Sequence, residues 1–386
     1  MKTKACIHLT AVTVVFNLWL GIWGSFPSEV RAQSALQPVD VPKFEVDPFW
    51  PKPLPDNWVT GELGGVCVDA QDHVFVLNRA ELYPKEKMIA KGAPPVIEFD
   101  PNGNAVNAWG DRALMPKSLH GCFVDSKGNL WIAGNHDGIV QEYAHDGSKM
   151  LLQTGTKGKF DSADGTDSGV TEVWATNSSH VFLNSPAGVA VDPTNGDVYI
   201  ADGYQNRRVV VFDREGHFLR QWGRQGTVEE VDAGLGGVFL QVVHCVVIGN
   251  DGLVYVCDRN GNRVQVFDKA GNFKRNILIP FSKVSHRIPQ EGNALLGYTG
   301  GTPGTACWLA FSPDPTQKLA YVCDCTDDEI RILDRATGQA LSSFGRSGHQ
   351  AGQMASAHTM AVDSKGNIYT AETQYGRRVQ KFTLVR

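Results

Sequence analysis

The sequence predicts an all-β fold, a six-bladed β-propeller, from three observations. One repeated segment occurs six times, in copies that begin at Gly64, His120, Ala187, His244, Cys307 and His358. Within each copy, short runs rich in valine, isoleucine, tyrosine and phenylalanine alternate with glycine, asparagine or aspartate turns, which is typical of strands joined by tight turns. No sustained helical period interrupts them. Sheets of this kind, arranged radially, bury their faces against one another and leave few exposed edges.

Each copy of the repeat is expected to supply one four-stranded blade. The fourth copy reads HCVVIGNDGLVYVCDRNGNRVQVFD from His244, with apolar runs separated by turns. The sixth copy reaches Arg386 without an evident fourth strand. We therefore expect the extended stretch Lys43–Thr60 to supply that strand and to close the ring. The predicted propeller covers 61–386, and 33–60 forms the N-terminal segment with the closing strand.

The first 32 residues read as a signal peptide. Lys2 and Lys4 precede an apolar run from Ile7 to Trp23, and Val30-Arg31-Ala32 offers small residues at the right places for cleavage. An uncleaved membrane anchor is the alternative, because the run is nearly long enough to span a bilayer. The small-residue site favours cleavage. We expect a secreted or periplasmic protein with no stable membrane association after signal removal.

The composition is that of an ordinary globular protein and argues against nucleic acid as a partner. The formal net charge is −5, and 42% of the residues are hydrophobic. Binding to nucleic acid requires a basic surface, and no cluster of lysine and arginine interleaved with aromatic residues occurs here. We expect a monomer with no nucleic-acid partner.

Seven cysteines follow the predicted leader, and most lie inside apolar runs. They are Cys67, Cys122, Cys245, Cys257, Cys307, Cys323 and Cys325. Their placement favours small buried apolar side chains over disulfides. A bridge between Cys257 and Cys323, which occupy equivalent positions in neighbouring blades, stays open.

Three of the eleven histidines share one position of the repeat. His120, His244 and His358 begin copies two, four and six, whereas Gly64, Ala187 and Cys307 begin copies one, three and five. A single histidine at the start of an inner strand is usually structural. Three in alternate blades around one axis would bring their imidazoles to one point, and the small residues between them would leave room for water or substrate. Three imidazoles with an open fourth position form a catalytic zinc site.

Charged and phenolic side chains share a second position, just after the second strand of the blade. Arg79 and Arg259 occupy it in blades one and four, and Tyr204 follows one residue later in blade three. An arginine in such a place is usually a solvated ion-pair partner, and a tyrosine there often packs a turn. Beside a metal centre, the two arginines are better interpreted as clamps for a carboxylate and Tyr204 as an acid–base group. The arginines that recur as N-x-R-V or G-R-R-V, namely Arg207, Arg208, Arg263, Arg377 and Arg378, are interpreted as partners of the preceding aspartates.

At these residues the sequence resembles a known family of enzymes. The run IADGYQNRRVVVFDREGHFLRQWG and the later run VVHCVVIGNDGLVYVCDRNGNRVQVF resemble the core of the peptidyl-α-hydroxyglycine α-amidating lyases, or peptidylamidoglycolate lyases. The resemblance implies a six-bladed propeller of NHL repeats with zinc bound by three histidines. It places His120, His244 and His358 as the zinc ligands, Tyr204 as the catalytic tyrosine, and Arg79 and Arg259 as the active-site arginines.

The resemblance also implies a reaction and shows departures from the family. An N-(α-hydroxyalkyl)amide would be cleaved to an amide and an aldehyde acid such as glyoxylate, with Tyr204 taking the hydroxyl proton. Gln205, Tyr255 and Val266 stand where the family's animal members have disulfide cysteines, so those bridges are not expected. Thr359 replaces the aspartate that helps hold a structural calcium in the family, which weakens the case for calcium. The alternative function is a non-catalytic NHL-repeat propeller that binds a protein or a ligand.

Overall fold

A computed structural model describes residues 41–161, 177–281 and 304–385. The chain divides into two units, Met1–Asp40 and Val41–Arg386, and every described residue lies in the second. The signal peptide predicted at 1–32 therefore lies outside the described residues. No helix among the described residues combines the length and the apolar character that crossing a membrane requires.

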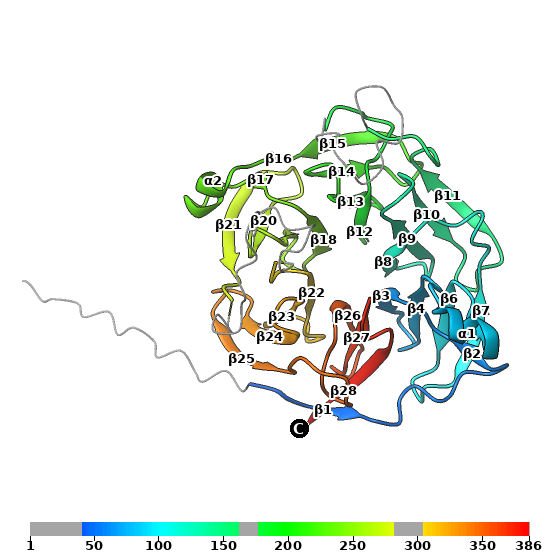
Figure 1. Ribbon diagram of the computed structural model, residues 1–386. Helices are drawn as coiled ribbons and strands as arrows, with labels where there is room; N and C mark the ends of the chain where they lie inside the picture. Colours follow the sequence, from blue (N-terminus) through cyan, green and yellow to red (C-terminus); the bar gives the residue numbers. More distant parts are fainter. Residues whose placement is uncertain (1–40, 162–176, 282–303, 386) are drawn as a thin grey trace, which may run out of the picture. The chain divides into compact units, whose positions relative to one another are not determined.

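The Val41–Arg386 unit is built from six four-stranded antiparallel sheets around a common centre, which confirms the predicted six-bladed propeller (Figure 1). From the innermost strand outward, the first three blades are β3 (Leu63–Val68), β4 (Val74–Asn78), β6 (Val96–Phe99) and β7 (Ala105–Trp109); β8 (Leu119–Val124), β9 (Leu130–Gly134), β10 (Val140–Tyr143) and β11 (Met150–Thr154); and β12 (Pro186–Val191), β13 (Val198–Asp202), β14 (Arg208–Phe212) and β15 (Phe218–Trp222). The next two are β18 (Val243–Ile248), β19 (Val254–Asp258), β20 (Arg263–Phe267) and β21 (Phe273–Leu278); and β22 (Trp308–Phe311), β23 (Leu319–Asp324), β24 (Glu329–Asp334) and β25 (Ala340–Phe344).

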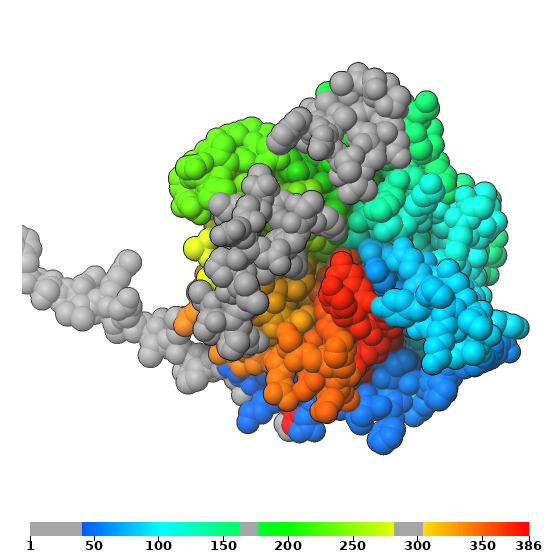
Figure 2. Space-filling model, in the orientation of Figure 1, coloured from blue at the N-terminus to red at the C-terminus, as the bar shows by residue number. Residues whose placement is uncertain are grey.

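The sixth blade closes the ring with strands from both ends of the described chain. Its order is β26 (Ala357–Val362), β27 (Ile368–Glu372), β28 (Val379–Val385) and β1 (Lys43–Asp47). β1 runs antiparallel to β28, with Phe44 opposite Leu384 and Val46 opposite Phe382. The closing strand predicted within Lys43–Thr60 is thereby confirmed. In the space-filling view the last blade, in red, lies beside the first, in blue and cyan (Figure 2).

Alternation and burial explain why these sequences form blades. The second strands, such as VFVLN in β4 and VYVCD in β19, are buried along their whole length and are rich in β-branched residues. The fourth strands, such as AVNAW in β7, are less buried, as expected for the outer edge of a blade. The apolar clusters each join neighbouring blades; one links Leu63 and Val76 of blade one to Tyr369 of blade six. The core therefore lies between the blades, and successive innermost strands contact one another around the full ring.

Short elements decorate the blades. β2 (Trp58–Val59) pairs in parallel with β5 (Lys91–Gly92), and β16 (Arg224–Gln225) pairs in parallel with β17 (Val238–Phe239). Two short helices are described, α1 (Pro84–Ile89) after β4 and α2 (Val228–Asp232) after β16. The Thr227 side chain caps α2 by accepting from the backbone N–H of Glu230.

The repeated arginines mostly pair as predicted. Arg208 and Arg263 bind the buried carboxylates of Asp202 and Asp258 through Nε at 2.9 Å. Arg378 binds Glu372, the residue at the equivalent position of blade six, at 3.1 Å. The prediction was wrong for two arginines. Arg207 donates to the carbonyls of its own turn, and Arg377 binds Glu86 of α1 at 2.8 Å. In both cases the next residue along the chain, Arg208 or Arg378, already binds the buried carboxylate.

The interpretation of the cysteines as unpaired apolar side chains was wrong for six of them. Disulfides join Cys67 to Cys122, Cys245 to Cys257 and Cys307 to Cys325, with Cα atoms 5.0 to 5.9 Å apart. The Cys257–Cys323 bridge that the sequence left open does not form, and Cys323 is a buried free thiol. The physical reason is strand packing. Cys67 and Cys122 lie on innermost strands of adjacent blades, whereas each of the other two bonds links residues on, or directly beside, the first and second strands of one blade. Such bonds persist in oxidising compartments.

Replacing Phe44 is expected to loosen the closure of the ring. Its ring stacks on Phe344 at 4.8 Å and meets Tyr321 edge-on at 5.8 Å, so it joins the closing strand to blade five. Because Phe44 is half-buried, Phe44→Ala should lower the free energy of unfolding by about 2 kcal/mol, less than for a fully buried phenylalanine. Denaturant unfolding measures this. Exposed Glu45 on the same strand provides the control, and equal effects of Glu45→Ala and Phe44→Ala would contradict the assigned packing.

Candidate metal centre and active site

The three histidines of the shared repeat position lie together at the centre of the ring. Each is the second residue of an innermost strand, His120 in β8, His244 in β18 and His358 in β26. One ligand nitrogen from each lies within 4.8 Å of the other two. The ring centroids are 4.4 to 5.0 Å apart, and all three residues are buried. The geometry that the repeat predicted for these side chains is present.

Backbone carbonyls fix the orientation of all three rings. Nδ1 of His120 lies 2.7 Å from the carbonyl oxygen of Ala187, Nδ1 of His244 lies 2.7 Å from that of Cys307, and Nδ1 of His358 lies 2.9 Å from that of Gly64. A carbonyl oxygen can only accept, so Nδ1 carries the proton in each ring. Each Nε2 is therefore unprotonated and carries a lone pair. Three lone pairs face one point, which is the arrangement that a bound cation satisfies.

These carbonyls belong to the residues that begin blades one, three and five. Gly64, Ala187 and Cys307 were predicted only to leave space beside the histidines, but their backbone carbonyls also orient the rings. The backbone of Gly64 also lies very close to blade two, because a Cβ built on Gly64 would lie 1.7 Å from the carbonyl oxygen of Leu119. Every second blade therefore supplies a ligand, and the blades between supply its hydrogen-bond acceptor. The alternation itself was the signal that could have revealed this.

Burial keeps the histidines neutral. Desolvation is the largest cause that lowers the pKa of each ring well below 6.5. Neighbouring positive charge acts in the same direction, since Arg79 and Arg259 both lower the pKa of His358. Hydrogen bonds from Nδ1 to the carbonyls oppose these effects only in part. Neutral imidazole is the form that binds a metal ion.

This pKa shift predicts how stability depends on pH in the metal-free chain. Below pH 6.5 the unfolded histidines take up protons that the folded ones cannot, so the free energy of unfolding falls as the pH falls. Above pH 6.5 the effect vanishes. The limit is about 1.4 kcal/mol per pH unit for each histidine. Denaturant unfolding at pH 5.5 and 7.5 should show a smaller pH dependence for His244→Asn than for the parent chain, and identical dependence would contradict burial in the neutral form.

Tyr204 lies against two of the histidines. Its phenol oxygen is 2.8 Å from Nε2 of His120 and 3.2 Å from Nε2 of His244. A phenol has one proton, so it can donate to only one of these lone pairs at a time. Tyr204 follows β13, and its N–H donates to the carbonyl of Ser185 at 3.1 Å. The preceding Gly203 approaches β18 so closely that a Cβ there would lie 2.0 Å from the carbonyl oxygen of Val243.

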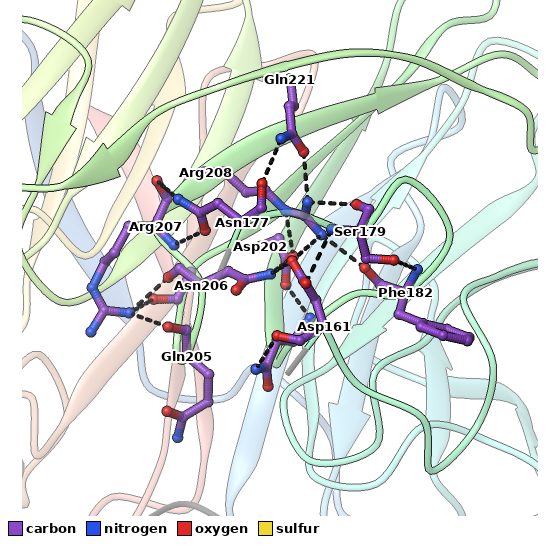
Figure 3. A network of polar contacts seen from close by, with 12 residues as sticks. Asp161, Asn177, Ser179, Phe182, Asp202, Gln205, Asn206, Arg207, Arg208 and Gln221 are labelled. Atoms are coloured by element: carbon purple, nitrogen blue, oxygen red, sulfur yellow. Dashed lines mark hydrogen bonds and ion pairs between the residues drawn. The ribbon is translucent and has the colours of Figure 1, made fainter. Parts of the chain in front are cut away.

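A buried polar network holds the turn that carries Tyr204 (Figure 3). Nη1 of Arg207 donates to the carbonyls of residues 203–206, at 2.7 to 3.3 Å. Nδ2 of Asn206 donates to Asp202 at 2.7 Å and to Asp161 at 3.0 Å. Arg208 binds the same two carboxylates. The network fixes the backbone on both sides of Tyr204, so the phenol is presented by a rigid turn.

Both predicted arginines border the same site. Nε of Arg79 donates to the carbonyl of Leu119 at 2.9 Å, and its Nη1 lies 3.2 Å from a carboxylate oxygen of Glu62. Arg259 is buried, and its Cζ lies 5.6 Å from the centroid of the Tyr204 ring. Glu62, which precedes β3, was not among the predicted site residues. Trp308, whose ring meets His244 edge-on at 6.0 Å, was not predicted either.

Blade five carries a cysteine at both repeat positions. Cys307 takes the place of histidine and Cys325 takes the place of arginine, and the two form a disulfide. The carbonyl of Cys307 is the one that orients His244. The covalent link therefore fixes this acceptor next to the metal-ligating side chain. The three histidines, which can hold a metal ion, thus lie against Tyr204, and Arg79 and Arg259 border the same site.

Comparison with known proteins agrees with the fold. The family model for the NHL repeat matches residues 183–220 and 240–267. Peptidyl-glycine alpha-amidating monooxygenase B of Xenopus laevis is 26% identical over 360 residues, which cover 88% of this chain and 35% of that protein. Peptidyl-alpha-hydroxyglycine alpha-amidating lyase 2 of Drosophila melanogaster is 28% identical, over 56% of this chain and 51% of that protein. The chain thus spans about a third to about a half of the length of these two relatives.

Two further proteins are similar. NHL repeat-containing protein 3 of Mus musculus is 29% identical over 59% of this chain and 57% of that protein. A solved structure of streptogramin B lyase superposes with a TM-score of 0.52 over 89% of this chain and 98% of that one, at 12% identity, which supports the fold alone. The chain is therefore a six-bladed propeller with NHL repeats, and it resembles the peptidyl-alpha-hydroxyglycine alpha-amidating lyases.

Proposed function

We propose that this protein is an exported zinc-dependent lyase that cleaves N-(α-hydroxyalkyl)amides, such as peptidyl-α-hydroxyglycine, to an amide and glyoxylate. One observation carries the proposal above the others. Three buried Nε2 lone pairs converge where a phenol and two guanidiniums also meet. The similarity to amidating lyases supports the same reaction class. The three disulfides support export to the periplasm or the extracellular space.

The donor set fits zinc. His120, His244 and His358 would hold the ion through Nε2, and their Nδ1–H groups are already bound to carbonyls, as outer-shell partners of a metal site require. Three neutral imidazoles with an open fourth position are the ligand set of catalytic zinc. When bound, zinc would supply Lewis acidity toward the substrate hydroxyl oxygen.

The protein side chains would bind the substrate and move one proton. A guanidinium of Arg79 or Arg259 would bind the substrate carboxylate bidentately, through two parallel N–H···O hydrogen bonds. The Tyr204 phenolate would accept the proton of the α-hydroxyl. As the hydroxyl oxygen forms the aldehyde carbonyl, the C–N bond breaks and its electron pair goes to the amide nitrogen. Tyr204 then returns the proton to that nitrogen, so that an amide and an aldehyde acid leave.

The experiment is a direct assay of the mature chain. Purified protein is incubated with α-hydroxyhippurate, and benzamide and glyoxylate are both quantified. We expect the two products in equal amounts, loss of activity after removal of metal by a chelator, and recovery on addition of Zn²⁺. Absence of product from a zinc-loaded, folded protein would overturn the proposal and favour the non-catalytic propeller. We propose that the active form is a monomer, which light scattering during the assay tests.

A further inference from the structure

A second group of metal-ligating side chains lies where blades one and two meet. This blade-junction cluster consists of Asp69, His73, Glu98 and His145. Asp69 and His73 belong to the turn between β3 and β4, Glu98 lies on β6, and His145 lies in the turn between β10 and β11. One ligand atom each from Asp69, Glu98 and His145 lies within 4.8 Å of the other two.

The cluster is separate from the central histidines. Asp69 is five residues along β3 from Gly64, whose carbonyl contacts His358, so extended backbone places it roughly 16 Å away. The Cys67–Cys122 disulfide joins the same two blades nearby. The cluster therefore lies at the far end of the strand from Tyr204 and the arginines, and no step of the proposed reaction uses it.

Contacts within the cluster pair each carboxylate with an imidazole. Nε2 of His145 lies 2.8 Å from Oδ2 of Asp69, and Nδ1 of His73 lies 2.6 Å from Oε1 of Glu98. The carboxylate side chains are almost fully buried, at 2% and 7% exposure, whereas the imidazoles are 39% and 30% exposed. Solvent therefore reaches the cluster from the histidine side, which leaves a path for an ion.

Charge balance distinguishes these two carboxylates from others in the ring. Buried Asp202, Asp258 and Asp324 each bind an arginine, which is positive at every accessible pH. The acidic cluster of Asp324, Asp327 and Glu329 likewise surrounds an arginine, Arg331, which forms an ion pair with all three. No lysine or arginine of the described residues forms an ion pair with Asp69 or Glu98. Their partners are imidazoles, which carry positive charge only when protonated.

Two buried carboxylates this close together, with no lysine or arginine in the described part of the chain paired to either, repel each other, and a cation bound between them would relieve this repulsion. We propose that the blade-junction cluster is a second metal site, which takes Zn²⁺ or a similar divalent transition metal. Asp69, Glu98 and His145 would supply two oxygens and one nitrogen. His73, whose Nδ1 lies 2.6 Å from Glu98, would stand beside them as a source of a second nitrogen. A mixed set of oxygen and nitrogen ligands suits zinc. Because the ligands come from two blades, the ion would join them in the way that the disulfide does nearby.

The test counts metal ions and does not depend on catalysis. Protein stripped with a chelator is reloaded with Zn²⁺, dialysed exhaustively and analysed for zinc, and the thermal midpoint is recorded with and without the ion. The parent chain should retain two equivalents, and Asp69→Asn and His145→Ala should each retain one. In a His244→Ala background, which removes a central ligand, zinc should still raise the thermal midpoint, and adding His145→Ala should abolish that rise.

A matched control separates a metal site from an ordinary ion pair. His217 and Asp213 form a similar pair at 3.0 Å on the surface, where the His217 side chain is 78% exposed. Among the described residues, neither belongs to a group of three side chains that could hold a metal ion. His217→Ala should keep both equivalents. If Asp69→Asn fails to fold, the more exposed His145→Ala carries the test. The proposal is overturned if His145→Ala retains as much zinc as the parent chain, or if zinc leaves the thermal midpoint of the His244→Ala protein unchanged.

Discussion

Tyr204→Phe is expected to lower kcat for cleavage of an α-hydroxyglycine substrate by about 10²- to 10⁴-fold, the usual contribution of a positioned acid–base group. The substitution removes one oxygen atom, which lies 2.8 Å from Nε2 of His120 and 3.2 Å from Nε2 of His244. The polar network holds the turn through backbone atoms, so the phenylalanine ring should occupy the same place. Zinc content and KM should change little, because neither the ligands nor the arginines are altered.

The measurement is steady-state kinetics with zinc analysis of the same preparation. Tyr199→Phe is the matched control, since Tyr199 lies in the same blade but its hydroxyl binds Arg220 at 2.7 Å, on the outer strand β15. We expect the control to keep the parent kcat. An unchanged kcat in Tyr204→Phe would show that the proton is taken by another group, whereas a joint loss of zinc and activity would show that the phenol supports the metal site.

The repeat made most of the fold and the gathering of the site predictable. A sequence position that recurs once per blade must recur at the same depth around the axis, so the register of His120, His244 and His358 already implied their meeting. The same logic predicted that Arg79, Arg259 and Tyr204 lie close to these histidines. The closing strand was predictable because the sixth copy of the repeat lacked a fourth strand, and the extended stretch before the first copy could supply it.

The contacts that depend on exact packing could not be predicted in this way. The pairing of Cys67 with Cys122 depends on how closely two innermost strands approach, which the spacing of cysteines along the chain does not state. The carbonyl acceptors of the histidines were missed because a backbone oxygen has no sequence signature. Arg207 and Arg208 are adjacent and identical in type, yet one binds a backbone turn and the other binds Asp202.

His244→Ala is expected to separate the enzyme from the scaffold more sharply than any other single change. It removes one of three converging lone pairs, so zinc affinity at the central site should fall by more than the 10- to 100-fold that is typical for loss of an outer-shell partner. Activity should fall with it at sub-saturating zinc. His244 is fully buried against Trp308, and its loss also leaves the carbonyl of Cys307 without its donor, so a moderate loss of stability is expected too.

Because His244→Ala is expected to change both stability and metal binding, the experiment needs a control variant that leaves both unchanged. His180 stacks on Phe218 at 3.9 Å on the outer strand β15 and shares no register with the three ligands, so His180→Ala should keep zinc and activity. Zinc titration by calorimetry and product formation at saturating zinc then report on separate questions. A propeller that only binds partners predicts no change in function for His244→Ala once the protein is folded. If His244→Ala turns over substrate as the parent does, the ring of imidazoles is structural and the proposed zinc dependence of the lyase fails with it.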